Sequence, residues 1–137
     1  MLDKVVATFG ALFVLTVFVI GFAISLGLMG LWYNLQNEAV YLAVSQAKYG
    51  GYTTKANTEL NRFIQECKLD RSRLTVQVSA AWGPVPWGTP VRATLTYRYP
   101  FKLAKWFTFD VPVTGAGRAV SAYVPGIYNV SYTGPIY

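Results

Sequence analysis

The side chains that could carry chemistry are few and lie far apart in this sequence. The chain has 137 residues, with 6 acidic residues, 12 basic residues, one cysteine and no histidine. Glu59 and Glu66 come closest to a carboxylate pair, because their spacing places them near one face of a helix. They have no third partner, so we interpret both as solvated helix surface. Since histidine is the commonest general base and metal ligand, its absence leads us to predict neither enzymatic activity nor a cofactor.

Three other short patterns have ordinary explanations. Cys67 has no partner for an internal disulfide, and its place on a predicted helix fits a small buried hydrophobe; a reactive thiol or an intermolecular bridge is the alternative. Asn129-Val130-Ser131 matches the glycosylation acceptor pattern, and Asn129 would be used only if that segment is exposed outside the cell. Gly115-Ala116-Gly117 lies between two predicted strands, so we interpret it as a turn and not as a phosphate-binding loop.

The dominant feature is the segment Val5–Tyr33, which contains no charged residue. At ~1.5 Å per residue it would form a helix of roughly 43 Å, longer than the ~30 Å hydrocarbon core of a bilayer. A signal peptide has an apolar region of only about 7–15 residues, so we expect this segment to be retained as a single membrane span. Trp32 and Tyr33 would mark its outer end.

Small residues and two charges in this region suggest contacts with other helices. Four glycines interrupt the apolar segment: Gly10, Gly21, Gly27 and Gly30. Small residues let helices approach closely in lipid, while a segment that can stretch or unwind is the alternative. Asp3 and Lys4 are the only charges before residue 38. Either they are interface residues, or Asp3 pairs with the N-terminal amine or Lys4 of a neighbouring subunit and fixes the axial register.

Beyond the apolar segment the helical pattern continues into a small head. A stripe of mostly apolar residues follows: Leu31, Leu35, Ala39, Leu42 and Gln46. Polar residues lie opposite it: Asn34, Asn37, Glu38 and Lys48. Because Gly50-Gly51 is a typical helix end, we expect one helix over about residues 3–48. Thr53 or Thr54 would cap a second helix that runs to about Cys67.

After residue 72 apolar and polar residues alternate, as in strands with one buried face. We expect four strands, at 73–80, 91–99, 106–113 and 118–124, with a loop at 83–90 and a hairpin turn at 114–117. The predicted fold class is α+β, with a roughly four-stranded antiparallel sheet packed on the upper half of the long helix. Residues 1–33 would form the membrane or filament-core helix, and residues 34–137 the extracellular part. The tail from Pro125 to Tyr137 would pack on another surface, for which a neighbouring subunit is a candidate.

The net charge of +6 comes from basic residues that are scattered between Lys48 and Arg118. They form no run of four or more, whereas a nucleic-acid arm or a lipid-binding patch would cluster them. We therefore interpret them as a solvated, mildly basic surface and predict no specific nucleic-acid partner.

A head on a long N-terminal helix that is first apolar and then amphipathic resembles the layout of type IV pilins. The continuation NLQNEAVYLAVSQAKYGG and the strand VRATLTYRYPF are similar, more closely, to the TadE-like branch found in tight-adherence pilus systems. The resemblance implies a structural subunit that waits in the cytoplasmic membrane. Pilus assembly machinery would then polymerise it with copies of itself into an extracellular adhesive filament. Many pilins carry a glutamate at the fifth position of the mature chain, where this chain has Val5; Asp3 would take that role if Met1 is the mature first residue.

Two other functions fit the same residues. The first is a minor pseudopilin that stays in the membrane or caps a secretion or pilus-assembly machine. The second is a single-span membrane protein whose head binds a partner. A filament on the cell surface that contains this chain would distinguish the pilin from both.

Overall fold

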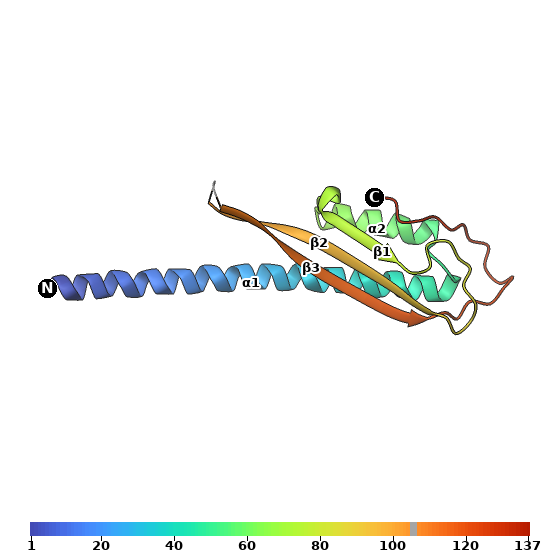
Figure 1. Ribbon diagram of the computed structural model, residues 1–137, viewed down its shortest axis with the longest axis horizontal. Helices are drawn as coiled ribbons and strands as arrows, with labels where there is room; N and C mark the ends of the chain where they lie inside the picture. The colour runs from blue at the N-terminus through green and yellow to red at the C-terminus, as the bar shows by residue number, and fades with distance from the viewer. Residues whose placement is uncertain (105–106) are drawn as a thin grey trace. The chain divides into compact units, whose positions relative to one another are not determined.

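The computed structural model describes residues 1–104 and 107–137. The helices are α1 (Leu2–Tyr49), α2 (Thr54–Glu66) and a short 3-10 helix η1 (Arg71–Arg73) (Figure 1). The strands are β1 (Leu74–Val78), β2 (Pro90–Ala104) and β3 (Phe107–Val120). This is the predicted α+β fold class. The chain divides into two compact units, Met1–Leu31 and Trp32–Tyr137, and we call the second unit the head.

The first unit is helical, and its side chains are exposed almost throughout. The hydroxyl groups of Thr8, Thr16 and Ser25 each donate a hydrogen bond of 2.8 Å to the carbonyl oxygen four residues earlier. These polar side chains are therefore satisfied within the helix and leave the surface apolar. By length and composition, α1 can cross a membrane. An N-terminal helix of this kind indicates membrane association or secretion.

The helix ends in the head follow from local chemistry and agree with the sequence prediction. Gly50 follows α1 with a φ of 76°, the left-handed conformation that glycine adopts most easily. Thr53 is the N-cap of α2, and its side-chain oxygen accepts a hydrogen bond of 3.2 Å from the Ala56 amide.

The sheet of the described residues has three antiparallel strands in the order β1-β2-β3, and not the roughly four that the sequence predicts. The error lies at residues 114–117, where a hairpin turn was expected but β3 continues as one strand of 14 residues. The two predicted strands on either side of that turn are parts of β3. The first of them was expected to begin at Trp106, which lies outside the described residues.

The glycines of β3 serve a close approach between backbones and not a turn. A Cβ added to Gly115 would lie 2.4 Å from the carbonyl carbon of Leu35, and one added to Gly117 would lie 2.4 Å from the carbonyl oxygen of Ala39. The strand therefore rests directly on the backbone of α1 within the head. A glycine inside a strand commonly marks such a site.

The side chains of two glutamines of α1 form hydrogen bonds with backbone groups of the sheet and of the segment that follows β1. The fully buried Gln46 donates to the Arg92 carbonyl at 3.2 Å and accepts from the Ala80 amide at 3.1 Å. The side-chain Nε2 of Gln36 donates to the Ala116 carbonyl at 2.6 Å, and its Oε1 accepts from the Ala116 backbone amide at 3.0 Å. These bonds explain why a polar residue occupies the Gln46 position of the apolar stripe. Both helices and all three strands contribute to the core, which includes Leu35, Ala39, Leu42, Leu60, Ile64, Val76, Val91, Leu95 and Val113.

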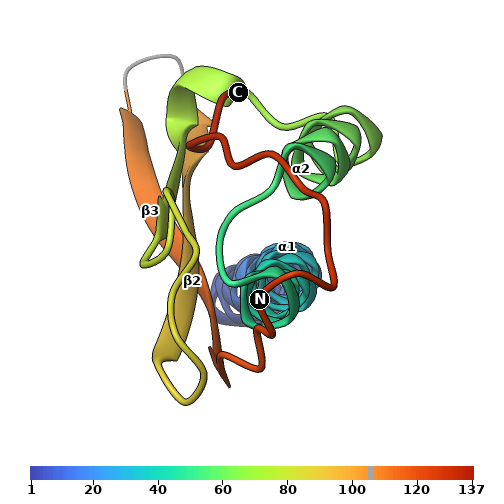
Figure 2. The ribbon, with the colours of Figure 1, turned by 90° about the vertical axis from the view of Figure 1, so that its right-hand side faces the viewer.

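The C-terminal tail packs on its own head. Residues 125–137 pass beside α2 (Figures 1 and 2). The Tyr132 hydroxyl donates to the Tyr49 carbonyl at 2.5 Å, and the Ile136 amide donates to Asn57 Oδ1 at 2.9 Å. The tail thus links the end of α1 to α2. The expectation that the tail packs is correct, and the surface that it covers belongs to the same chain.

Candidate assembly surfaces

The two N-terminal charges lie in the first turn of α1, and both side chains are exposed. Neither Asp3 nor Lys4 forms an ion pair within the described part of the chain. Adjacent helical residues do not face each other, so a partner for either charge must come from elsewhere. The pairing of Asp3 with a neighbouring subunit stays a prediction.

The four glycines of the first unit leave open surface. A Cβ added to Gly10, Gly21, Gly27 or Gly30 would meet no atom within 4 Å. No contact within the described residues therefore requires glycine at these positions, in contrast to Gly115 and Gly117. An open surface of small residues is what close helix–helix packing in lipid needs. Their role in packing or flexibility stays a prediction.

The outer face of the sheet collects basic residues that are scattered in the sequence. On β2 the alternate residues Val91, Ala93, Leu95 and Tyr97 are buried, so the side chains between them point away from the core. The exposed basic residues of this outer face are Arg92, Arg98, Lys102 and Arg118, which we call the basic face.

The charges of the basic face lack ion-pair partners among the residues that the structure describes. Arg92 and Arg118 are direct cross-strand partners, an arrangement of like charges that destabilises a sheet. The one acid on the outer sides of β2 and β3, Asp110, is held by Arg73 at 2.9 Å. No member of the basic face forms an ion pair within the described residues. Sequence reasoning missed this face, although the period-two phase of VRATLTYRYPFK could have shown that Arg92, Arg98 and Lys102 share one side.

Three carboxylates gather between α1 and α2, and we call Glu38, Glu59 and Glu66 the acidic side. Arg62 contacts Glu59 at 2.6 Å and Glu66 at 3.8 Å. Glu38 forms no ion pair in the described part of the chain, and its Oε1 is buried without a hydrogen-bond partner there. Burial, followed by the negative charge of Glu59, raises the pKa of Glu38 from 4.5 to about 7.

Glu38 is another position where the structure goes beyond the sequence. The periodicity places Glu38 opposite the apolar stripe, but this side of α1 is half-buried because charged residues of α2 lie beside it. A residue's neighbours on a second helix cannot be read from the period of its own helix.

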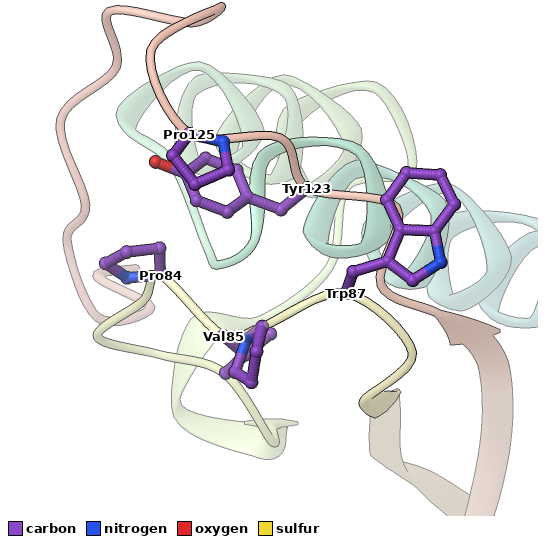
Figure 3. A pocket seen from close by; sticks show the side chains of 6 residues that line it. Pro84, Val85, Trp87, Tyr123 and Pro125 are labelled. Carbon is purple, nitrogen blue, oxygen red and sulfur yellow. The ribbon is translucent and has the colours of Figure 1, made fainter.

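A shallow apolar hollow of about 340 Å³ lies beside the loop that precedes β2 (Figure 3). Its lining residues come from this loop and from the segment after β3: Pro84, Val85, Pro86, Trp87, Tyr123 and Pro125. The lining contains no carboxylate, amine or thiol, and Tyr123 supplies its hydroxyl group. Trp82 and Trp87 of the same loop are largely exposed.

The remaining candidate residues lie apart from these surfaces. Cys67 is the C-cap of α2 and is half-buried, not fully buried as its pattern suggested, because the helix ends there. Burial and the charge of Glu66 raise the pKa of its thiol. Asn129 is exposed in the tail, so the acceptor triplet is accessible, and its glycosylation stays a prediction. Among the described residues no group of three His, Cys, Asp or Glu side chains could hold a metal ion.

Comparisons with models of known protein families, with curated proteins and with solved structures found no match for this chain. The architecture is nevertheless pilin-like. It combines a long N-terminal helix, apolar in its first part, with a small antiparallel sheet packed on the last part of that helix.

Proposed function

We propose that this chain is the structural subunit of a type IV-like filament, of the TadE-like kind. The subunit is held first in the cytoplasmic membrane by α1. Pilus assembly machinery then polymerises it into an extracellular filament that serves surface attachment.

The observation that carries this proposal is the dual character of α1. The 48-residue helix has exposed apolar side chains in the first unit and buried ones in the head, where Leu35, Ala39 and Leu42 form part of the core. At ~1.5 Å per residue its length is roughly 70 Å, whereas the hydrocarbon core of a bilayer is only ~30 Å thick. Such a helix suits a subunit whose apolar part serves as membrane anchor and later as filament core.

The exposed apolar side chains restrict where the first unit can reside. Phe9, Phe13 and Phe18 each expose more than two thirds of their surface. Keeping one such side chain in water costs about 1.5–3 kcal/mol, and the unit carries many of them. Lipid can cover this surface, and so can a bundle of identical helices. Extraction from the membrane is therefore favourable only when other copies replace the lipid.

The experiment that tests the proposal is electron microscopy of the native cell surface combined with mass spectrometry of purified filaments. We expect a helical filament in which this chain, including residues 1–31, is the repeating unit. A chain found only in membrane fractions would refute the proposal. That result would favour the minor pseudopilin or the single-span membrane protein with a partner-binding head.

A further inference from the structure

We propose that the basic face of one head docks against the acidic side of the head of a second copy, and that this contact joins neighbouring heads in the polymer. The inference rests on the proposed function and adds to it the surfaces through which the heads recognise each other.

The basic face needs a partner that supplies negative charge. Arg92, Arg98, Lys102 and Arg118 are exposed and unpaired in the described residues, and the nearby Asp110 is already bound by Arg73. Thr94 and Thr96 lie between the arginines of β2 on the same side. The result is a sheet surface that carries hydroxyl and cationic groups beside a few apolar residues, among them the exposed Val120. Charge complementarity between such surfaces fixes register and partner choice.

The acidic side has the opposite need. Arg62 pairs with Glu59 and Glu66, and the described residues supply no ion pair to Glu38. The buried Oε1 of Glu38 also lacks a hydrogen-bond donor within the described chain. An unsatisfied buried acceptor costs free energy, and positive charge brought close to the acidic side by a second head would lower the electrostatic part of that cost.

The two surfaces cannot satisfy each other within one head. The inner face of the sheet packs on α1 through Gly115 and Gly117, so the basic face points away from both helices. Figure 2 shows β2 and β3 on one side of the head and α2 on the other. A contact between two different surfaces of identical subunits is heterologous, and it leaves one free surface at each end. Such a contact produces an open helical polymer. A polyanion such as DNA could also bind the basic face, but it would not explain the acidic side of the same head.

Charge reversal in the full-length chain tests the proposal. Arg98→Glu and Glu66→Arg should each reduce filament yield by about tenfold or more, since like charges then meet across the contact. The double variant Arg98→Glu/Glu66→Arg should recover most of the yield. Co-expression of the two single variants should do the same, because their surfaces are complementary again. Lys48→Glu is the matched control for Arg98→Glu, since it makes the same change of net charge on an exposed residue outside both surfaces, and it should leave the yield unchanged.

Thiol crosslinking tests the same contact without any change of charge. Cys67 adjoins Glu66, so Thr96→Cys places a second thiol on the opposite surface. A short bismaleimide should then link filament subunits into a ladder that extends beyond dimers, because each chain carries both halves of a heterologous contact. Adding Cys67→Ser should abolish the ladder.

The outcomes separate the two proposals. If wild-type chains form no filament, the proposed function fails and this inference fails with it. Wild-type filaments that tolerate both charge reversals, or that give no crosslinked ladder, overturn this inference alone. The inference is also overturned if the reversals leave filaments intact but abolish retention on DNA-cellulose, since the basic face would then belong to a polyanion.

Discussion

Gly117→Ala perturbs one of the two closest contacts between the sheet and the long helix within the head. The added Cβ would lie 2.4 Å from the carbonyl oxygen of Ala39 and 2.7 Å from the Cα of Val40, whereas an ordinary van der Waals contact begins at 3.4 Å. Both contacted atoms belong to the backbone, so no side chain can rotate away. The strand and the helix must therefore separate by about 1 Å.

The expected loss of stability combines two effects. Overpacking in a core costs typically about 1–3 kcal/mol. Separation also stretches the paired hydrogen bonds between Gln36 and Ala116, each with a net value of about 1 kcal/mol. We expect the free energy of unfolding to fall by about 3 kcal/mol, out of the roughly 5–15 kcal/mol typical of a domain. The melting temperature should fall by roughly 12–24 °C.

The assay is urea unfolding of the full-length chain in a nonionic detergent, followed by the near-ultraviolet circular dichroism of the buried Tyr52 and Tyr97. Gly21→Ala is the matched control, because the same added methyl meets no atom within 4 Å and should leave the head transition unchanged. If Gly117→Ala stays within about 0.5 kcal/mol of wild type, β3 does not rest on the backbone of α1. The turn at residues 114–117 that the sequence predicts would then have to be considered again.

Three further predictions concern single side chains. The folded head keeps the Glu38 proton up to a pKa of about 7, while the unfolded chain loses it near 4.5, so the free energy of unfolding should fall as pH rises between these values. Glu38→Gln should remove that dependence on pH and stabilise the head at pH 8 by about 2 kcal/mol after allowance for solvent exposure. Urea titrations at several pH values measure this effect, and the exposed Glu66→Gln is the control. Gln46→Leu leaves the Ala80 amide without a partner and removes one of two hydrogen bonds from the Arg92 carbonyl, which keeps the Ser79 amide, so it should cost about 2 kcal/mol in the same titration. The exposed Gln65→Leu should cost less than about 0.5 kcal/mol. Asp3→Ala should leave membrane insertion intact, as measured by cell fractionation, but abolish filament assembly, as seen by microscopy. The control Thr16→Ala should leave the filament yield unchanged. An unchanged yield for Asp3→Ala would rule out the proposed register role.

Features that depend on neighbours in the chain could be read from the sequence. The exposed apolar surface of α1 follows from an uncharged segment, and its end at Gly50 follows from the conformational freedom of glycine. Thr53 caps α2 because its hydroxyl reaches an amide three residues later. The alternation in β1 and β2 likewise needs only the period of a strand. Each of these features depends on sterics and hydrogen bonds over a few residues, so the local pattern is sufficient.

Features that depend on distant segments needed the tertiary structure. Whether the chain turns at Gly115-Ala116-Gly117 or continues as a strand depends on the backbone of α1, against which these residues pack. Ala116 and its hydrogen-bond partner Gln36 on α1 lie 80 residues apart in the sequence. Strand register decides that Arg92 faces Arg118, and the position of α2 decides that Glu38 is desolvated. The sequence alone therefore established an apolar N-terminal helix on an α+β head. The two oppositely charged surfaces of that head exist only because folding brings together residues whose positions in the chain do not reveal their proximity.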